Sequence, residues 1–562
     1  MGEEKFWKES YDEGLDDIDP QMWESSFVEI IKPIFDEFAD KPALAYLGTE
    51  VSFAELDRFS NRFANMLIAD GFKKGDVVGI SLPNIPEYVI AWLGTLKAGC
   101  AVSGVSPLLS SEEMEYQLGD SNVKGLVVLD VFFADKLVNI APNLLELKFV
   151  VAASLEEFMP TKKTTKSGLP PLTGKTVYSF GDVIKTEKFS AETPRVEITP
   201  DDIAYIQYTG GTTGTPKGAM LSHRNAVAEL LITHTWMQRE REGGAALSGY
   251  PFFHIAGLAF NGKCIYRGLT QVLIPNPRDT EHICTELARY KPRILSNVPS
   301  LYQLLMANPK FRALDHSNIE TCVSGAAPFP EKAQGELESI IGEGKLLEVY
   351  GMTETSPVAT MNPAKGKKKL GSVGLPLLNT EIKLIDPETG KEVARGEPGE
   401  VCIKGPQVMV GYYNKPEETK RAIDEEGYLH TGDIAVQDEE GYLRIVDRIK
   451  DMINVSGFKV YSKKVEEVLA GHPAIEMIAY IGVTNPDRPG SEIVKAFITI
   501  KPSYEFDGDE EALREDIIRF AKEKLAPYEV PKIIEFRKEL PLTRVGKIDK
   551  KQLRKEAQQE LI

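Results

Sequence analysis

The run from Tyr208 to Gly218 concentrates glycines, hydroxyl side chains and one lysine in a single loop. A glycine backbone has no Cβ atom, so it can approach a polyphosphate closely and point several N–H groups at it. Threonine hydroxyls add neutral donors, and Lys217 adds a positive charge. A strand-like apolar run precedes the loop and helix-like residues follow it, so we predict a phosphate-binding loop. Its candidate ligand residues are Thr209, Gly210, Gly211, Thr212, Thr213, Gly214 and Lys217.

This loop is not the common P-loop of nucleotide-binding proteins. That motif has glycine directly before its lysine and serine or threonine directly after it, whereas Lys217 lies between Pro216 and Gly218. A flexible surface linker is the alternative interpretation. Linkers are not usually flanked by two strongly apolar segments, so we favour phosphate binding by a different kind of loop.

Other short motifs accompany the loop in a fixed order along the chain. They occupy residues 51–56, 96–100, 251–254, 350–354, 430–433, 447–451 and 546–547. Together with the loop they closely resemble the adenylate-forming superfamily, which contains acyl-CoA synthetases, adenylation domains of peptide synthetases and beetle luciferases. The resemblance covers nearly the whole chain. It implies an enzyme that joins a carboxylate to the α-phosphate of ATP, releases pyrophosphate, and then lets a thiol displace AMP.

The motif at 350–354 supplies candidate residues for the nucleotide and its metal ion. A carboxylate beside a polyphosphate is repelled unless a cation lies between them, so Mg²⁺ coordination is the role expected of Glu354. The resemblance implies that Thr353 contacts the α-phosphate and that Tyr350 stacks on adenine. It assigns the other adenine wall to Gly325, Ala326 and Ala327. A solvated glutamate and a core tyrosine are the alternatives.

Three later motifs carry a carboxylate and two cations. Asp433 can accept hydrogen bonds from both ribose hydroxyls, which is the role that the resemblance implies, and Arg448 would add a second ribose contact. Lys547 follows Gly546 near the end of the sequence. A long flexible cation can bridge the attacking carboxylate and the α-phosphate, so the resemblance identifies Lys547 as a catalytic residue.

Three further residues match family positions. Lys450 lies where the family has the hinge of a small domain that takes two arrangements, one for each half-reaction. Gly457 resembles the glycine that lets the pantetheine arm of CoA pass close to the backbone. His254 matches a position near the acyl carboxylate and is a candidate catalytic residue, with a structural histidine as the alternative. It is not expected to act in a Ser/His/Asp triad.

Length and composition set limits on the class of protein. A chain of 562 residues exceeds what one core usually supports, so at least two domains are expected. The net charge of −18, from 66 basic and 84 acidic side chains, disfavours broad binding to nucleic acid or to an anionic membrane. Five dispersed cysteines predict reduced thiols in a cytoplasmic protein. The acidic N-terminus lacks a signal-peptide core, so any membrane contact should be peripheral.

The elements that position these residues follow from periodicity. Ser52 and Glu55 have capping-box spacing at the start of a helix, and strand-like runs at 77–82, 125–129 and 148–152 alternate with helical segments. This alternation predicts an α/β fold with parallel sheets. Residues 371–441 read as a β subdomain. We expect a large N-terminal domain of layered sheets and helices over 1–449, which binds ATP and the acid, and a small mobile α+β domain over 450–562.

Other stretches of the sequence bear on which carboxylic acid is activated. The residues around 297–302, 446–448 and 455–460 look most like fatty-acyl-CoA ligases, and 256–260 could line an apolar tunnel for an alkyl chain. ATP, Mg²⁺ and CoA are the expected co-substrates and cofactors. Aryl-acid ligases of the coumarate type, and an adenylation enzyme that loads a carrier protein, are the alternatives. The sequence leaves open whether the chain forms a homodimer.

Overall fold

The computed structural model describes residues 5–559 apart from 161–168, 170, 210–214, 240, 242, 457, 486–487, 489–490, 507 and 543–547. The chain divides into two compact units. Unit 1 holds Met1–Glu381, Ile403–Leu429 and Glu440–Tyr442, and unit 2 holds Ile382–Cys402, His430–Glu439 and Leu443–Ile562. The two units are described one after the other.

The described part of unit 1 contains an eight-stranded sheet that is mainly parallel. Its order is β19 (Gly411–Tyr412), β9 (Lys217–Ser222), β8 (Ile203–Thr209), β4 (Ala101–Gly104), β3 (Val77–Ser81), β5 (Val123–Leu129), β6 (Phe149–Ala153) and β7 (Thr176–Ser179). The strands from β8 to β7 are parallel, whereas β9 and β19 add antiparallel edge strands. The predicted strands at 77–82, 125–129 and 148–152 are confirmed as β3, β5 and β6.

A nine-stranded sheet forms the other half of unit 1. Its order is β16 (Leu375–Pro376), β15 (Val358–Met361), β14 (Leu346–Gly351), β13 (Thr321–Ser324), β12 (Ile294–Asn297), β10 (Ala245–Ser248), β11 (Thr270–Leu273), β1 (Pro42–Tyr46) and β2 (Thr49–Ser52). The strands from β14 to β1 run parallel. Parallel strands place their carboxyl ends at one edge, which is where ligands bind in open α/β sheets.

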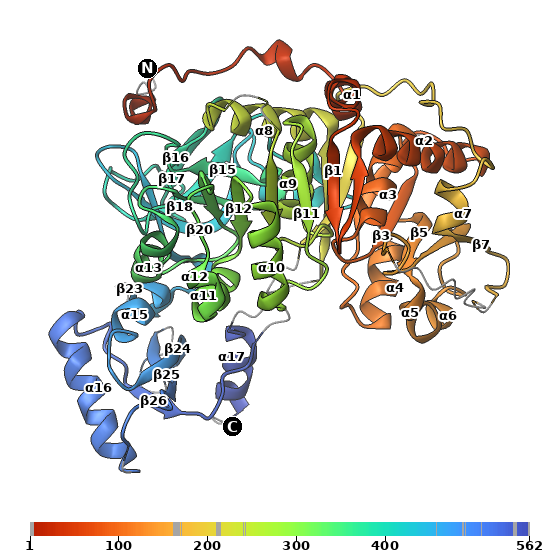
Figure 1. Cartoon of the computed structure of the whole chain (residues 1–562). Helices are drawn as coiled ribbons and strands as arrows, with labels where there is room; N and C mark the ends of the chain where they lie inside the picture. Colours follow the sequence, from red (N-terminus) through yellow and green to blue (C-terminus); the bar gives the residue numbers. More distant parts are fainter. Residues whose placement is uncertain are drawn as a thin grey trace. The chain divides into compact units, whose positions relative to one another are not determined.

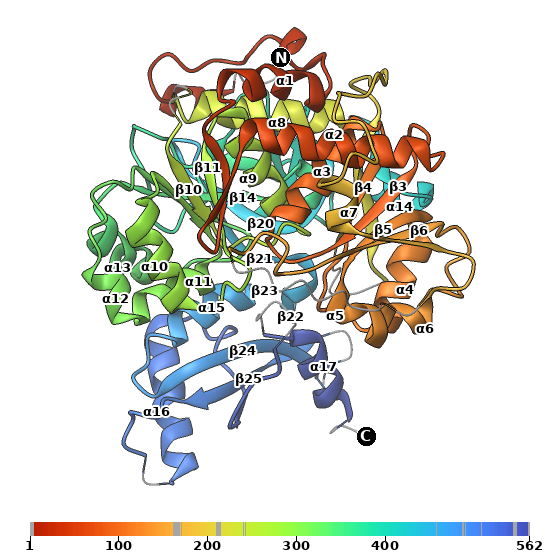
Figure 2. The same ribbon diagram turned by 45° about the vertical axis from the view of Figure 1, so that its right-hand side comes forward.

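Helices cover these sheets and fill the space between them. The segment from α2 (Phe53–Ala69) to α7 (Phe180–Ile184) lies on one side of unit 1, and the segment from α10 (Thr280–Tyr290) to α13 (Glu331–Ile341) lies on the other (Figures 1 and 2). The remaining helices of this unit are α1 (Phe27–Glu37), α3 (Pro86–Lys97), α4 (Ser111–Asp120), α5 (Asp130–Phe132), α6 (Val138–Ile140), α8 (His223–Trp236), α9 (Ile255–Tyr266), α11 (Pro299–Ala307), α12 (Pro309–Ala313) and α14 (Pro416–Ala422).

The local signals of unit 1 act as predicted. The Ser52 hydroxyl accepts from the Glu55 N–H at 3.1 Å, and the Glu55 carboxylate accepts from the Ser52 N–H at 3.0 Å, which completes the capping box of α2. Every residue of α3 is buried, so its apolar sequence belongs to the core. None of the described helices combines the length and the apolar character needed to cross a bilayer. All five cysteines are buried free thiols.

A buried cation joins α3 to α2. The Lys97 ammonium lies 2.6 Å from Asp57 Oδ1 and 2.8 Å from both Ser60 Oγ and Asn61 Oδ1. Its side chain is 3 % exposed, and burial lowers the pKa of Lys97. These three contacts offset the cost of taking an ammonium group out of water, because a buried charge must be paired and hydrogen-bonded.

Replacing Lys97 by alanine should therefore destabilise unit 1. We expect a loss of about 3 kcal/mol in unfolding free energy, because three polar groups of α2 lose a partner and a cavity forms. A fall in the urea midpoint of unfolding measures this loss. Lys73→Ala is the matched control, since Lys73 is exposed and its removal should change the free energy by less than about 0.5 kcal/mol. Equal midpoints for the two variants would contradict the prediction.

Unit 2 combines a β subdomain with a small α+β domain. The subdomain is a four-stranded sheet of β17 (Glu381–Ile385), β18 (Gly399–Lys404), β20 (Leu429–Gln437) and β21 (Leu443–Arg448). The rest consists of β22 (Ile453–Val455), β23 (Phe458–Val460), α15 (Ser462–Leu469), β24 (Ile475–Thr484), β25 (Glu492–Ile500), α16 (Glu510–Lys524), β26 (Ile533–Phe536) and α17 (Lys550–Gln559). Apolar residues of α15, α16, β24 and β25 form one buried core.

The fold class is confirmed: a large α/β domain of sheets and helices with a β subdomain is followed by a small C-terminal α+β domain. The described strands at 381–448 confirm the predicted β subdomain and extend it beyond residue 441. Most residues of this β subdomain belong to unit 2, the same compact unit as the C-terminal residues. The predicted domain boundary between residues 449 and 450, and the hinge expected at Lys450, stay predictions.

Candidate active site

The phosphate loop connects two antiparallel strands. Thr209 ends β8, Lys217 begins β9, and these two residues face each other in the register. Gly210, Gly211, Thr212, Thr213 and Gly214 lie outside the described residues. The expected order of strand, loop and helix needs a correction, because β9 is inserted before α8 begins at His223. The positive end of α8 therefore does not follow the predicted phosphate loop directly, and phosphate binding by this loop and Lys217 stays a prediction.

Lys217 belongs to a chain of contacts that sequence reasoning missed. Its ammonium lies 2.9 Å from Glu418 Oε2 and 4.5 Å from the centre of the Tyr412 ring. The Tyr412 hydroxyl in turn donates to Glu354 Oε1 at 2.7 Å. Burial and the neighbouring Glu354 carboxylate raise the pKa of Tyr412, so the phenol stays protonated and keeps donating. The phosphate-loop lysine and the candidate metal ligand are thus connected through one tyrosine.

Glu354 is held in a short, buried turn. A 3-10 helix over Thr353–Thr355 follows β14, and the Thr355 hydroxyl accepts from the Met352 N–H at 2.9 Å. The Met409 N–H donates to the Glu354 carbonyl at 2.8 Å. Thr353 and Glu354 are 7 % and 9 % exposed. Among the described residues only Tyr412 donates to the carboxylate, so Oε2 has an open coordination position, which suits a hard cation such as Mg²⁺.

Removing the Tyr412 hydroxyl should weaken metal use without dismantling the site. For Tyr412→Phe we expect the Mg²⁺ concentration at half-maximal adenylation to rise roughly tenfold, because a hydrogen bond to a charged group is lost. Initial rates of pyrophosphate release across a Mg²⁺ titration give this value. Tyr413→Phe is the matched control, since the Tyr413 hydroxyl is 3.3 Å from Asn122. An unchanged Mg²⁺ requirement in Tyr412→Phe would show that the contact does not position Glu354.

The two predicted adenine walls follow neighbouring parallel strands. Gly325, Ala326 and Ala327 come directly after β13, and Tyr350 lies near the end of β14. A Cβ on Gly325 would lie 2.6 Å from Cγ2 of Val349, so only glycine allows this close approach to β14. Ala326 has φ 66°, a left-handed conformation that turns the chain at the edge of the sheet. Ala326 and Tyr350 line the same cavity.

The surroundings of His254 bear on both the catalytic and the structural interpretation of this residue. It is the N-cap of α9, where its Nδ1 accepts from the Ala256 N–H at 3.2 Å, so the ring proton is assigned to Nε2. The side chain is also exposed and lines the cavity that contains Tyr350. The capping contact accounts for Nδ1 only, and the role of His254 near an acyl carboxylate stays a prediction.

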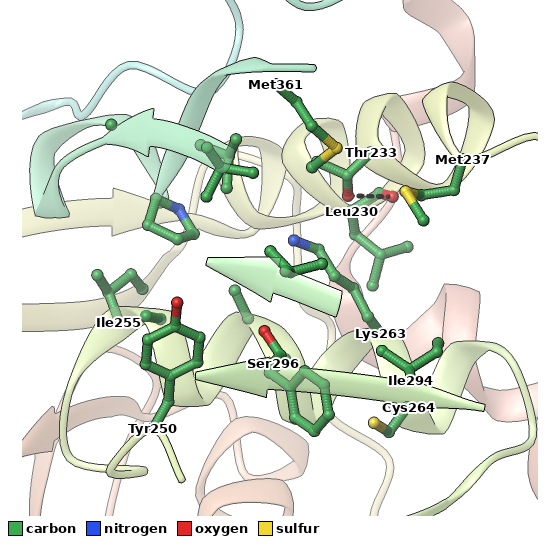
Figure 3. Close-up of a pocket in the computed structure, with 18 of the residues that line it drawn as sticks. Leu230, Thr233, Met237, Tyr250, Ile255, Lys263, Cys264, Ile294, Ser296 and Met361 are labelled. Carbon is green, nitrogen blue, oxygen red and sulfur yellow. Dashed lines mark hydrogen bonds between the residues drawn. The ribbon is translucent and has the colours of Figure 1, made fainter. Parts of the chain in front are cut away.

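The cavity is an apolar chamber of about 140 Å³. Leu230 from α8, Met237 directly after that helix, Ile294 from β12 and Met361 from β15 form parts of its wall (Figure 3). The predicted lining at 256–260 is right for one helix face only. Ala256, Ala259 and Phe260 line the cavity, whereas 257 and 258 do not, as expected when successive residues turn around a helix.

The candidate ribose residues lie side by side in unit 2. Asp433 on β20 faces Arg448 on β21, and Arg448 Nε is 2.9 Å from Asp433 Oδ1. Lys450 lies in the 3-10 helix Ile449–Asp451, and its pKa is lowered by burial and by the neighbouring Arg448. Gly457 and Lys547 lie outside the described residues. The roles assigned to all five residues stay predictions.

The part of β20 that precedes Asp433 is held by a buried glutamate. Glu400 Oε1 accepts from the Gly432 N–H at 3.0 Å, and Oε2 is 3.1 Å from His430 Nδ1. The ligand atoms of Glu400, Cys402 and His430 lie within 4.8 Å of one another. Because both Glu400 oxygens already have partners, we assign this group to holding the strand segment that carries Asp433.

Family models match most of the chain. The model described as AMP-binding enzyme matches residues 34–413, and the model described as AMP-binding enzyme C-terminal domain matches residues 464–547. The chain belongs to the AMP-binding enzyme family. The family uses ATP, and the roles of the loop, Tyr350 and Glu354 in this AMP-binding enzyme stay predictions. The predicted boundary at 449 and 450 lies between the two matched segments.

Curated relatives and solved structures agree with this membership. The long-chain-fatty-acid–CoA ligase of Bacillus subtilis is 38 % identical, with 92 % of each chain covered, and that of Escherichia coli O6:H1 is 36 % identical, with 98 % of each covered. The anthranilate CoA ligase AuaEII in complex with anthranoyl-AMP has a TM-score of 0.84 at 28 % identity and covers 97 % of this AMP-binding enzyme. All of that chain is covered. ATP-bound MatB from Rhodopseudomonas palustris has a TM-score of 0.80 at 28 % identity, with 94 % of this chain and 98 % of that chain covered.

Proposed function

We propose that this AMP-binding enzyme is an ATP- and Mg²⁺-dependent fatty-acid–CoA ligase. The observation that carries the proposal is the apolar cavity lined by His254, Ala326 and Tyr350, at the carboxyl ends of the parallel strands. Such a cavity can hold an alkyl chain while its carboxylate meets the nucleotide. The long-chain-fatty-acid–CoA ligases among the relatives, at 36 % and 38 % identity, support the choice of acid.

The reaction proceeds in two displacements. A carboxylate oxygen bonds to the α-phosphorus of ATP while the bond to pyrophosphate breaks, and the CoA sulfur then bonds to the acyl carbon while AMP leaves. The first step brings two anions together, so positioning and charge neutralisation supply most of the catalysis. Mg²⁺ held by Glu354 would neutralise phosphate charge. Lys217 and the loop would hold the departing pyrophosphate, and Thr353 would contact the α-phosphate.

We extend the proposal to residues of unit 2, whose roles follow from the family resemblance. Asp433, positioned by Arg448, would accept the ribose hydroxyls. Lys547 would bridge the attacking carboxylate and the α-phosphate. Gly457 would let the pantetheine arm approach, with Lys450 at the hinge between the two half-reactions.

Product analysis of the purified chain tests this function. With ATP, Mg²⁺, CoA and a panel of alkyl and aryl carboxylic acids, we expect AMP and pyrophosphate with alkyl acids, and acyl-CoA only when CoA is present. ADP and orthophosphate as products would overturn the proposal. An aryl acid that reacts faster than every alkyl acid would identify an aryl-acid ligase, and adenylate formation without acyl-CoA would identify a carrier-loading enzyme.

A further inference from the structure

The acyl cavity extends along the whole of α9. His254 precedes this helix and Arg267 follows it, and both residues line the cavity. Twelve residues of α-helix correspond to about 18 Å. His254 follows the carboxyl end of β10, and Tyr350 lies at the carboxyl end of β14 in the same run of parallel strands, whereas Arg267 comes shortly before β11 begins. The Arg267 end is therefore the one remote from the reacting carboxyl. That remote end is lined by His234, Met237, Tyr266, Arg267, Leu269 and Ile294.

The guanidinium group of Arg267 has no partner at this remote end. Arg267 is 7 % exposed, and its Nε is buried without a hydrogen-bond acceptor. Its side chain makes no hydrogen bond or ion pair with any residue that the structure describes. An arginine carries its charge at all physiological pH values, and a buried unpaired charge is among the most unfavourable groups in a protein. The site therefore lacks an anion.

The charges of the described residues do not supply that anion. Glu320 is the carboxylate that attracts Arg267, but it already binds Arg239 and lies 2.7 Å from the Nε of Arg293. Among the described residues, Arg267 therefore shares the attraction of Glu320 with two other guanidinium groups. Burial and the nearby Arg239 and Arg293 lower the pKa of Arg267, which reflects this excess of positive charge.

Two further polar side chains lie in the same part of the wall. Burial and the charge of Arg267 lower the pKa of His234 to about 4, so this ring is neutral at pH 7, and its Nδ1 is buried without a partner. Lys263 is drawn in Figure 3, and its ammonium lies 2.7 Å from the buried Glu229 Oε1. Lys263 and Glu229 neutralise each other, so this pair cannot serve as the missing anion.

We propose that the cavity accepts fatty acids with a second carboxylate at the end remote from the reacting carboxyl, and that Arg267 binds this carboxylate. The inference rests on the proposed function, which places the acyl chain in this cavity. A guanidinium fork matches the two oxygens of a carboxylate, and His234 can contribute a further hydrogen bond. The apolar wall between the two ends suits the methylene chain of an α,ω-dicarboxylic acid. Arg267 is then a specificity-determining residue.

Paired substrates test the remote site. The purified full chain is assayed for pyrophosphate release with dodecanedioate and with dodecanoate, which differ only at the remote end. We expect kcat/KM to favour dodecanedioate at least about tenfold. Arg267→Met should lower kcat/KM for dodecanedioate on the order of a hundredfold and raise it for dodecanoate, because an apolar end replaces the cation. General destabilisation would lower both values together. Arg278→Met, which removes an exposed arginine, should leave the ratio unchanged.

Other results of these experiments would contradict carboxylate binding by Arg267. A wild-type preference for dodecanoate, with the same ratio in Arg267→Met, would overturn the inference and leave the ligase function intact. Equal rates with ω-hydroxydodecanoate and dodecanedioate would show a site for a neutral polar group and overturn the carboxylate assignment. If no acid releases pyrophosphate, the proposed function fails. Calorimetric titration of dodecanedioate into wild type and Arg267→Met then decides the remote site, and equal affinities would overturn it.

Discussion

Replacing Lys547 by alanine should lower adenylate formation by roughly 10²–10³-fold or more while leaving thioester formation from a supplied acyl-adenylate close to the wild-type rate. The reason is electrostatic. In the first half-reaction a carboxylate must approach a polyphosphate, and a cation at the reacting oxygens offsets the repulsion in the transition state. In the second half-reaction a thiol attacks an acyl-adenylate from which pyrophosphate has already gone, so the lysine has no such repulsion to offset.

Two assays on the same enzyme preparation separate these half-reactions. Pyrophosphate release in the absence of CoA measures adenylation, and CoA-dependent release of AMP from synthetic acyl-adenylate measures thioester formation. Lys551→Ala is a suitable control, because Lys551 is an exposed lysine of α17 and should affect neither rate. Equal losses in both half-reactions of Lys547→Ala would contradict the proposed role and indicate damage to the domain as a whole.

Local signals in the sequence were enough to predict much of the fold. The Ser52–Glu55 capping box and the strands at 77–82 and 125–129 depend on neighbouring residues and on apolar periodicity, and these interactions are present within short windows. The inserted strand β9 was not predictable, because its pairing with β8 depends on tertiary contacts that a glycine-rich loop does not reveal.

Other functional residues could not be predicted from the sequence, for a different reason. Glu418 is 201 positions from Lys217, and Tyr412 is 58 positions from Glu354, so no local spacing connects them. Arg267 reads as an ordinary helix-end arginine, which favourably meets the negative end of α9. Only burial without a partner distinguishes it, and burial is a property of the folded chain. Residue types and their order along the chain predicted the chemistry of the site. The pairs Lys217–Glu418 and Glu354–Tyr412, and the place of Arg267 at the remote end of the cavity, required the structure.

Glu354→Gln should lower the adenylation rate by roughly 10²–10³-fold at a fixed Mg²⁺ concentration, with part of the activity regained as Mg²⁺ is raised. Glutamine keeps the size of the side chain and its Oε1 can still accept from the Tyr412 hydroxyl, so the turn at Thr353–Thr355 should keep its shape. The change removes the negative charge, and a hard divalent cation binds a neutral amide oxygen more weakly than a carboxylate.

The Mg²⁺ titration distinguishes a metal ligand from a structural glutamate. A ligand role predicts a curve for Glu354→Gln shifted to higher Mg²⁺, and a larger shift than that of Tyr412→Phe, because the tyrosine acts on the metal only through Glu354. The double variant should therefore shift the curve no further than Glu354→Gln alone. Glu343→Gln, which neutralises an exposed glutamate, should coincide with wild type. A lowered maximal rate with an unchanged Mg²⁺ midpoint would contradict metal coordination and assign Glu354 to holding the turn after β14.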